Sequence, residues 1–218
     1  MTTATLETHA PHASRKASKD VRRLQLIDAT ISVLARKGYA ALTVADVAKA
    51  AGLSAGIINF HFDSKDGLLA ECLQHLTNEF YRNWKANIER PGATTAERLR
   101  ATLLGDFDDA VFSPDKLRAW IAFWGESQGR PVYEEISAAK DVERSRAVEA
   151  ACAELIADGG YALDSAAITR ALEAMLDGLW LDVVSTSTRR SHIESAANAR
   201  QSIKAVLHSF FPKHFPQT

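Results

Sequence analysis

The stretch LTVADVAKAAGLSAGIINFHFDSKDGLL, which covers residues 42–69, decides how this chain folds. Thr43 and Asp46 have the spacing of a capping pair at the start of a helix, and Gly52 is a residue type that commonly ends one. Ser54 then has the position of a cap for a second short helix. The stretch therefore predicts two helices of roughly two turns each, joined at Gly52, which is the geometry of a helix-turn-helix.

Helical spacing continues on both sides of this stretch, and no convincing run alternates with the period of a strand. Upstream, apolar residues recur at intervals of three and four until a Lys-Gly pair that is typical of a helix end. Downstream, a Pro-Gly pair separates a long fourth helix from five further helical segments. The expected helices cover residues 21–37, 43–51, 54–62, 65–90, 94 or 95 to 111, a segment from 113, 131–158, 164–187 and 191–211.

These segments predict an all-α protein of about nine helices in two domains. A small three-helix unit containing the helix-turn-helix covers residues 21–66, and a larger helical domain covers residues 67–218. Residues 1–20 are rich in Ala, Thr and Ser with few acids, and we expect them to form a flexible basic arm.

The composition indicates in which compartment the protein works and what kind of partner it binds. The two cysteines, Cys72 and Cys152, give neither a disulfide framework nor a metal-binding pair, and no apolar run approaches the roughly 20 residues needed to span a membrane. We therefore expect a cytoplasmic protein without a membrane segment. Residues 1–65 hold nine Lys or Arg against five Asp or Glu, although the whole chain has a formal net charge of −1. This asymmetry favours a polyanionic partner at the N-terminal end only.

The second short helix has two chemically different sides. Its apolar residues can pack on the preceding helix: Leu53, Ile58 and Phe62. Its small and amide residues allow close approach to DNA bases: Ala55, Gly56 and Asn59. Residues at its ends and edges can reach phosphates: Ser54, His61 and Lys65. Phe60 can either pack on the fourth helix, which we favour, or contact thymine methyl groups. Spacing alone leaves DNA binding and a purely structural helix pair equally open.

Residues 42–69 also resemble the DNA-binding domain of TetR-family transcriptional repressors. The shared pattern has a Thr opening the second helix, a Gly-Leu-Ser turn, an aromatic pair ending the third helix and Ser-Lys opening the fourth. Asn59 replaces the Tyr that most members carry, and Phe60 stands where a polar residue is usual. The resemblance implies operator DNA as a partner, with contacts from Thr43, Val44, Ser54, Ala55, Gly56, Ile57, Asn59, Phe60, His61 and Lys65.

The resemblance further implies a homodimer whose last two helices form a four-helix bundle with those of the partner. Here these helices are residues 164–187 and 191–211. A dimer presents two recognition helices to a palindromic operator. A ligand would act by favouring a dimer shape that DNA binds poorly, and the helix beginning at Lys65 is the expected lever.

The segment KLRAWIAFWGES, residues 116–127, suggests what the larger domain binds. Trp120, Phe123 and Trp124 fall on one face of a helix, and Asp177 and Trp180 are similarly spaced further along the chain. An aromatic stripe is usually core. Several rings with a carboxylate, however, are also what a cage for a quaternary ammonium requires.

Together with GDFDDA (residues 105–110) and DGLWL (177–181), this segment resembles the sensor domain of the choline-responsive repressors of glycine betaine synthesis genes, a branch of the same family. The resemblance implies choline or a related quaternary amine as effector and osmoprotection as the role. Another small molecule remains the alternative. The expected pocket residues are Trp120, Trp124, Trp180, Asp177, Asp106, Phe107, Phe123 and Tyr133.

Two readings from other classes remain. Asp106 and Asp109, three residues apart, could hold a metal in an all-α enzyme, but no His or Glu lies within a turn to complete a site. We therefore expect neither catalysis nor a metal or cofactor. An interaction protein that has lost DNA binding is disfavoured by the intact Thr43, His61 and Lys65.

Overall fold

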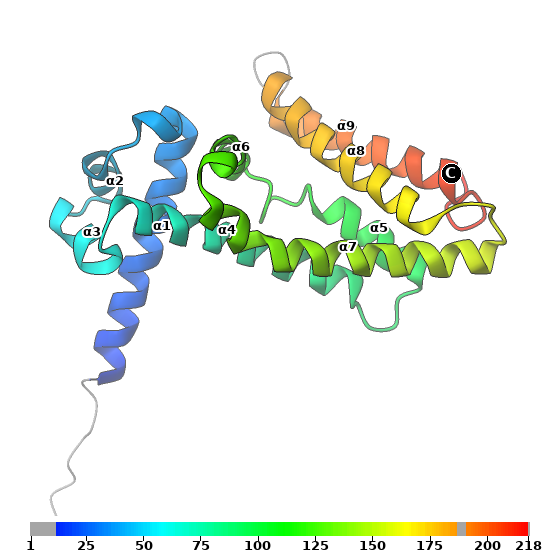
Figure 1. Cartoon of the computed structure of the whole chain (residues 1–218), viewed down its shortest axis with the longest axis horizontal. Coiled ribbons are helices and arrows are strands. Elements are labelled where there is room, and N and C mark those ends of the chain that lie inside the picture. Colours follow the sequence, from blue (N-terminus) through cyan, green and yellow to red (C-terminus); the bar gives the residue numbers. More distant parts are fainter. Residues whose placement is uncertain (1–11, 187–190, 218) are drawn as a thin grey trace, which may run out of the picture.

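The structure is a computed structural model, which describes residues 12–186 and 191–217. Within these residues it contains nine α-helices, one short 3-10 helix and no strand, so the predicted all-α fold is confirmed (Figure 1). The helices are α1 (His12–Ala41), α2 (Val44–Ala51), α3 (Ala55–Phe62), α4 (Lys65–Ile88), α5 (Thr95–Gly105), α6 (Pro114–Glu126), η1 (Ser127–Gly129), α7 (Pro131–Gly159), α8 (Ser165–Thr186) and α9 (His192–Phe210).

The helix-turn-helix forms where the capping residues predict it. The Thr43 hydroxyl accepts a hydrogen bond from the Asp46 N–H at 3.1 Å, which satisfies a free donor at the start of α2. Gly52 ends α2 in the left-handed region, with φ of 66°, and its N–H bonds back to carbonyls of the last turn. Ser54 takes the cap position of α3, but its side chain makes no capping hydrogen bond.

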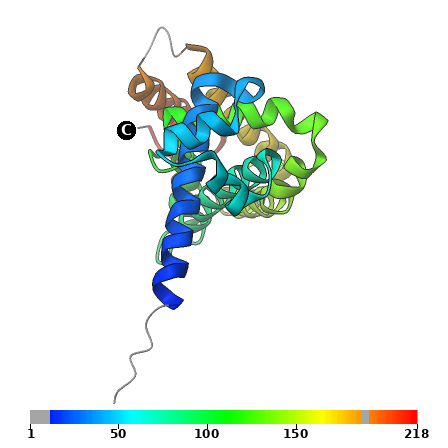
Figure 2. The same ribbon diagram turned by 90° about the vertical axis from the view of Figure 1, so that its left-hand side faces the viewer.

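The first helix is longer than its apolar pattern predicts. It begins at His12, inside the segment for which composition favours a flexible arm, and residues 1–11 lie outside the described part. The Ala, Lys and Arg residues that follow His12 are good helix formers, which explains the extension. Figures 1 and 2 both show the N-terminal part of α1 projecting away from the other helices. Gly38, with φ of 74°, marks a kink before its end.

Helix α5 ends at Gly105. The sequence pattern predicts an end at residue 111, and this prediction is wrong. The Asn83 side chain donates a 2.8 Å hydrogen bond to the Gly105 carbonyl, and a Cβ at this glycine would lie 2.5 Å from the Asn87 amide nitrogen. Helix α4 therefore approaches the end of α5 closely at this point. The following residues form a turn, so Asp106 leaves the helix and enters the interior of the domain.

The larger domain is built around the long helices α4 and α7, which pack against each other, with α8 packing on α7 (Figure 1). Helices α8 and α9 lie side by side at the end of the molecule away from α1–α3. The main connection between the two ends is the packing of α6 on α1, supported by α4. Helix α6 therefore touches both the small domain and the larger one.

Small and apolar residues remain exposed on the outer faces of α8 and α9: Ala167, Ala171, Ala174, Gly178, Leu181, Ile193 and Ala197. On the inner face of α9, Ile203 and Leu207 are fully buried in the core of the same chain. None of the described helices is both long and apolar enough to cross a membrane.

Candidate functional site

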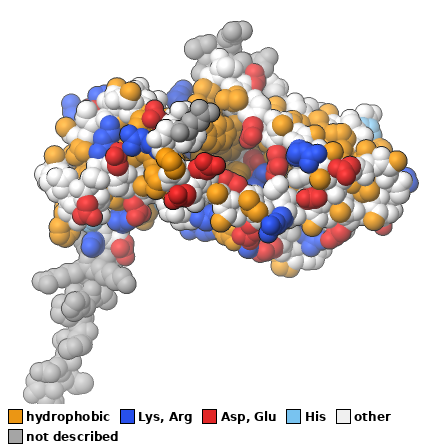
Figure 3. Space-filling view, viewed as in Figure 1, with side chains coloured by type: hydrophobic (Ala, Val, Ile, Leu, Met, Phe, Trp, Pro, Cys, Tyr) orange, Lys and Arg blue, Asp and Glu red, His pale blue; other side chains and the backbone are white. Residues whose placement is uncertain are grey.

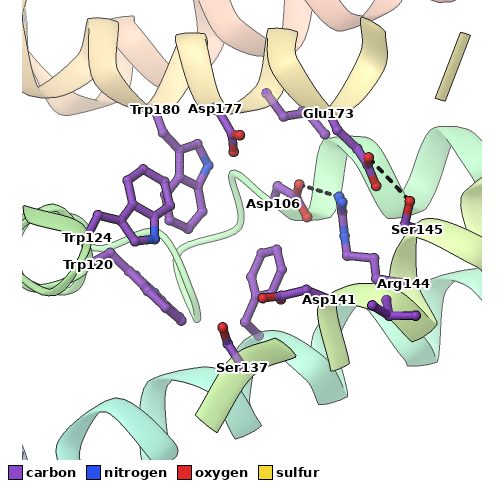
Figure 4. Close-up of a pocket in the computed structure, with 13 residues that line it drawn as sticks. Asp106, Trp120, Trp124, Ser137, Asp141, Arg144, Ser145, Glu173, Asp177 and Trp180 are labelled. Carbon is purple, nitrogen blue, oxygen red and sulfur yellow. Dashed lines mark hydrogen bonds and ion pairs between the residues drawn. The ribbon is translucent and has the colours of Figure 1, made fainter. Parts of the chain in front are cut away.

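A cavity of about 500 Å³ lies in the larger domain between α4, α6, α7 and α8. Figure 3 shows the hollow on this face, with hydrophobic side chains inside it and acidic ones at its edge. Its lining residues are Phe80, Asp106, Trp120, Trp124, Ser137, Asp141, Val142, Arg144, Ser145, Glu173, Leu176, Asp177 and Trp180. Five of the eight pocket residues expected from sequence, three tryptophans and two aspartates, line this one cavity (Figure 4).

The tryptophans form one side of the cavity. The Trp124 and Trp180 rings stack with centroids 5.9 Å apart and planes 23° apart, and Trp120 meets Trp180 edge-on at 6.4 Å. Phe80 on α4 also contacts Trp180, at 5.9 Å. Phe80 is not among the residues expected from sequence, because a lone Phe on a long helix carries no signal of its own. These rings offer several π faces to a cation, each of which attracts it electrostatically.

A buried ion pair lies deeper in the cavity. Asp106 is 2% exposed, and its Oδ2 accepts a 2.7 Å hydrogen bond from Arg144 Nη2 on α7. Burial raises the pKa of Asp106 to about 6, although Arg144 acts in the opposite direction. Arg144 was also missed, because one Arg among several charged residues on α7 is not distinctive in sequence. Asp106 therefore lines the cavity, and Arg144 holds its carboxylate in place.

Further carboxylates line the cavity from α7 and α8. Asp177 and Asp141 are exposed at its rim, and Glu173 is half-buried and accepts a 3.3 Å hydrogen bond from the Ser145 hydroxyl. The protein around Asp177 raises the pKa of that carboxyl, mainly through desolvation, and Arg144 partly offsets the effect. The cavity therefore combines an aromatic side with a strongly acidic remainder.

The other three expected residues lie outside this cavity. Phe123 and Tyr133 line a neighbouring cavity of about 360 Å³, which shares Trp120, Trp124 and Ser137 with the first. Phe107 is fully buried and packs against Phe112 with ring centroids 4.7 Å apart, so it lines neither cavity.

Asp106 and Asp109, the pair that an alternative reading assigned to a metal, do not converge. Asp106 is buried and paired with Arg144, whereas Asp109 is exposed. The cause is the early end of α5, which takes both residues off a common helix face. Among the described residues, no group of three or more His, Cys, Asp or Glu side chains is arranged to hold a metal ion.

The candidate DNA-contacting residues of the small domain are all at least partly exposed. Thr43, Ser54, Ala55, Gly56, Asn59 and Phe60 are exposed, and Val44, Ile57, His61 and Lys65 are partly exposed. Ile58 and Phe62 are buried in the core, as their side of the helix predicts. The expectation that Phe60 packs on the fourth helix is wrong, because its side chain is 68% exposed. Ile58 and Phe62 lie on the inner side of α3, one turn apart. Phe60 is two positions from each of them, so its side chain must point outward.

Two of these residues also have structural contacts. The ammonium of Lys65 donates a 2.7 Å hydrogen bond to the Leu42 carbonyl, which ties the start of α4 to the segment before α2. Desolvation lowers the pKa of His61, and the nearby Lys19 and Arg23 act in the same direction. His61 is therefore neutral at pH 7 and can offer a hydrogen bond rather than a charge.

Comparison with known families agrees with both halves of this description. A family model described as "Bacterial regulatory proteins, tetR family" matches residues 26–72. A second, described as "BetI-type transcriptional repressor, C-terminal", matches residues 95–212.

Among similar proteins, the HTH-type transcriptional regulator BetI of Paraburkholderia xenovorans (strain LB400) is 36% identical over 169 residues, which cover 75% of this chain and 82% of that protein. The regulator of the same name from Burkholderia thailandensis is 34% identical over the same length, with the same coverage.

Among solved structures, a putative transcriptional regulator from Pseudomonas aeruginosa PAO1 has a TM-score of 0.68 at 28% identity, covering 88% of this chain and 94% of the other. A putative regulator from Saccharomonospora viridis in complex with choline has a TM-score of 0.72 at 21% identity, covering 87% and 96%. At that identity the second match shows a common fold.

Proposed function

Because this chain belongs to the TetR family of transcriptional repressors and has a BetI-type C-terminal domain, we propose that choline, or a closely related quaternary amine, is its effector. In this proposal the protein represses genes that convert choline to glycine betaine, an osmoprotectant, and releases its operator when choline accumulates. It would act in the cytoplasm. The family consists of regulators and not of enzymes, so the cavity serves sensing and not catalysis.

The observation that carries the choline proposal is the meeting of three tryptophan rings and two carboxylates in one cavity. A quaternary ammonium has no N–H to donate, so ring faces and apolar space suit it better than hydrogen-bond acceptors do. Nearby carboxylates balance its charge. The choline-bound structure from Saccharomonospora viridis supports the proposal, because it has the same fold.

We further propose the division of labour between domains. Residues 21–66 would bind the operator, with α3 in the major groove and the exposed residues of α2 and α3 facing DNA. Residues 67–218 would bind the effector and form a homodimer through the exposed faces of α8 and α9. Two copies are needed because a palindromic operator presents two half-sites.

The first expected result is that choline releases the protein from DNA taken from upstream of its own gene. A coupling of roughly 1–3 kcal/mol would lower operator affinity about 5- to 150-fold at saturating choline. Fluorescence anisotropy of labelled DNA measures the release. The control ligand is 3,3-dimethylbutan-1-ol, which has the shape of choline but carries no charge. The choline proposal fails if choline leaves operator affinity unchanged, or if the neutral alcohol acts equally well.

The route from the cavity to the small domain runs, in our proposal, through an aromatic junction. Phe123 lies on the same helix as two of the cavity tryptophans and meets Tyr133 edge-on at 5.4 Å. The Tyr133 and Tyr39 hydroxyls are 2.6 Å apart, which joins the start of α7 to the end of α1. Arg130 lies over the Tyr39 ring and forms a 3.2 Å ion pair with Asp66 in the first turn of α4. The lever expected from sequence, α4, thus meets this junction at its first turn.

A second expected result is that Tyr133→Phe weakens the coupling between the two sites. The change removes only the hydroxyl that bonds to Tyr39. Because a hydrogen bond contributes about 0.5–1.5 kcal/mol, the effect of choline on operator affinity should shrink about 2- to 10-fold. Calorimetry and anisotropy measure choline affinity, operator affinity and their interdependence separately.

The matched control for the junction is Tyr81→Phe, which removes a hydroxyl that donates a 3.2 Å hydrogen bond to Glu143 away from the junction. We expect this variant to keep the full effect of choline. If both variants respond to choline as the unmodified protein does, the junction does not transmit the signal.

A further inference from the structure

We propose that the cavity has a second cation-binding end, at Glu173, and that its preferred ligands are linear dications. One cationic group would lie among the tryptophans, and the other, an ammonium with N–H groups, against the Glu173 carboxylate. The inference rests on the proposed binding of a cation at the tryptophan end, and it adds the chemical class of the whole ligand.

The size of the cavity is the first reason. Choline displaces about five water molecules, or roughly 150 Å³ at ~30 Å³ for each water. The cavity measures about 500 Å³, which lies in the ~300–1,000 Å³ range of sites that hold larger organic ligands. A single choline among the tryptophans therefore leaves most of the space unoccupied by ligand.

The shape of the lining is the second reason. Figure 4 shows the three tryptophans on one side of the cavity, Glu173 and Ser145 on the opposite side, and Asp106 between them. Ser137, Asp141 and Ser145 are spaced by four residues, so they follow one face of α7 along the cavity. At ~1.5 Å rise per residue, the seven positions that separate Trp180 from Glu173 on α8 correspond to about 10 Å. The cavity is thus an elongated channel with chemically different ends.

The charge balance is the third reason. Four carboxylates line the cavity, from Asp106, Asp141, Glu173 and Asp177, against the single guanidinium of Arg144. One monocation would leave two negative charges without a partner, and like charges in a partly enclosed site repel each other. The described carboxylates are not grouped to chelate a metal ion. An organic ligand with two separated positive charges meets this arrangement better.

Two unpartnered buried atoms, one on the tryptophan side and one in the middle of the cavity, indicate that the cavity is built for a polar ligand. Asp106 Oδ1 has no hydrogen-bond partner among the described residues, although the residue is only 2% exposed. The indole N–H of Trp120, which is 7% exposed, is unpartnered in the same sense. Buried polar groups normally find a partner, and both residues line the cavity, so a bound ligand or its water is the natural source.

The spacing predicts the ligand's length. An extended chain advances about 1.2 Å per bond, since a three-bond residue spans at most ~3.3–3.6 Å. A separation of roughly 8–10 Å between the two charges therefore needs about six to eight methylene groups. The suitable probe is (6-aminohexyl)trimethylammonium, and the matched monocation is hexyltrimethylammonium, which has the same hydrocarbon chain without the amine.

The experiment compares the two probes by calorimetry and by tryptophan fluorescence, with choline as reference. Because a hydrogen bond to a charged group is strong, the aminohexyl probe should bind about 10-fold tighter than the hexyl probe. Shortening its chain to two methylenes should remove this advantage. In Glu173→Gln the ratio of the two affinities should fall towards one.

The control variant is Glu135→Gln, which removes the same charge from an exposed position of α7 outside the cavity lining. It should keep the tenfold ratio. Equal binding of the two probes, or a ratio that survives Glu173→Gln, overturns the dication proposal while choline binding still supports the proposed effector class. If choline and both probes fail to bind, the cation-sensing function and the dication proposal are both wrong.

Discussion

Replacing Trp180 with Ala is expected to lower choline affinity about 30- to 100-fold, because a desolvated cation–π contact contributes about 2 kcal/mol or more. Trp180 is 5% exposed and contacts both of the other cavity tryptophans, so its loss removes one ring and frees two. Isothermal titration calorimetry with choline measures the change. No other single substitution at the tryptophan side should have a larger effect, because Trp180 is the ring that the others share.

Two further variants make this result interpretable. A Trp→Ala change in a core costs about 3–5 kcal/mol of stability, so Trp180→Phe should be measured beside it, with an affinity loss of about fivefold. Trp84→Phe alters a tryptophan that is 2% exposed but lines a different cavity, and it should keep normal choline affinity. A folded Trp180→Ala protein that binds choline normally would place the choline site elsewhere.

Replacing Gly56 with Glu is expected to abolish operator binding while leaving the fold intact. Gly56 is exposed on α3, and a Cβ at this position would meet no atom within 4 Å. The new carboxylate would therefore fit the helix and would face DNA phosphates. Like-charge contact at an interface costs several kcal/mol, so operator affinity should fall at least about 100-fold.

Anisotropy with labelled operator DNA measures this effect, and thermal unfolding checks the fold. The control is Gly125→Glu, which makes the same change at an exposed position near the end of α6 where a Cβ also meets no atom within 4 Å. It should bind DNA normally. Normal operator binding by Gly56→Glu would mean that α3 does not lie in the groove.

The candidate DNA-contacting residues differ from the sequence expectation in two of their side-chain environments. Phe60 points outward next to Asn59, so an exposed aromatic ring is available where packing was expected. The ring lies 5.6 Å from the Lys19 ammonium, which places a basic residue of α1 beside α3. The ammonium of Lys65, by contrast, donates a hydrogen bond to the Leu42 carbonyl. A phosphate contact by Lys65 would use one of the two N–H groups that this hydrogen bond leaves.

The helices and the helix-turn-helix can be predicted from local sequence, because caps, glycine ends and apolar spacing act between residues a few positions apart. Thr43 with Asp46 and the left-handed Gly52 are where those local rules predict them. Helical spacing also places Trp120 and Trp124 on one face of a helix, and both line the cavity.

The completion of the cavity and its connection to the small domain depend on contacts between residues far apart in the sequence. The pairing of Asp106 with Arg144 spans 38 positions, and that of Tyr39 with Tyr133 spans 94. No local pattern encodes such contacts, because they depend on which helix faces meet after folding. The end of α5 at Gly105 follows the same rule, since side chains from α4 set it. The carboxylates of α7 and α8 likewise line one cavity only because the fold brings these two helices together.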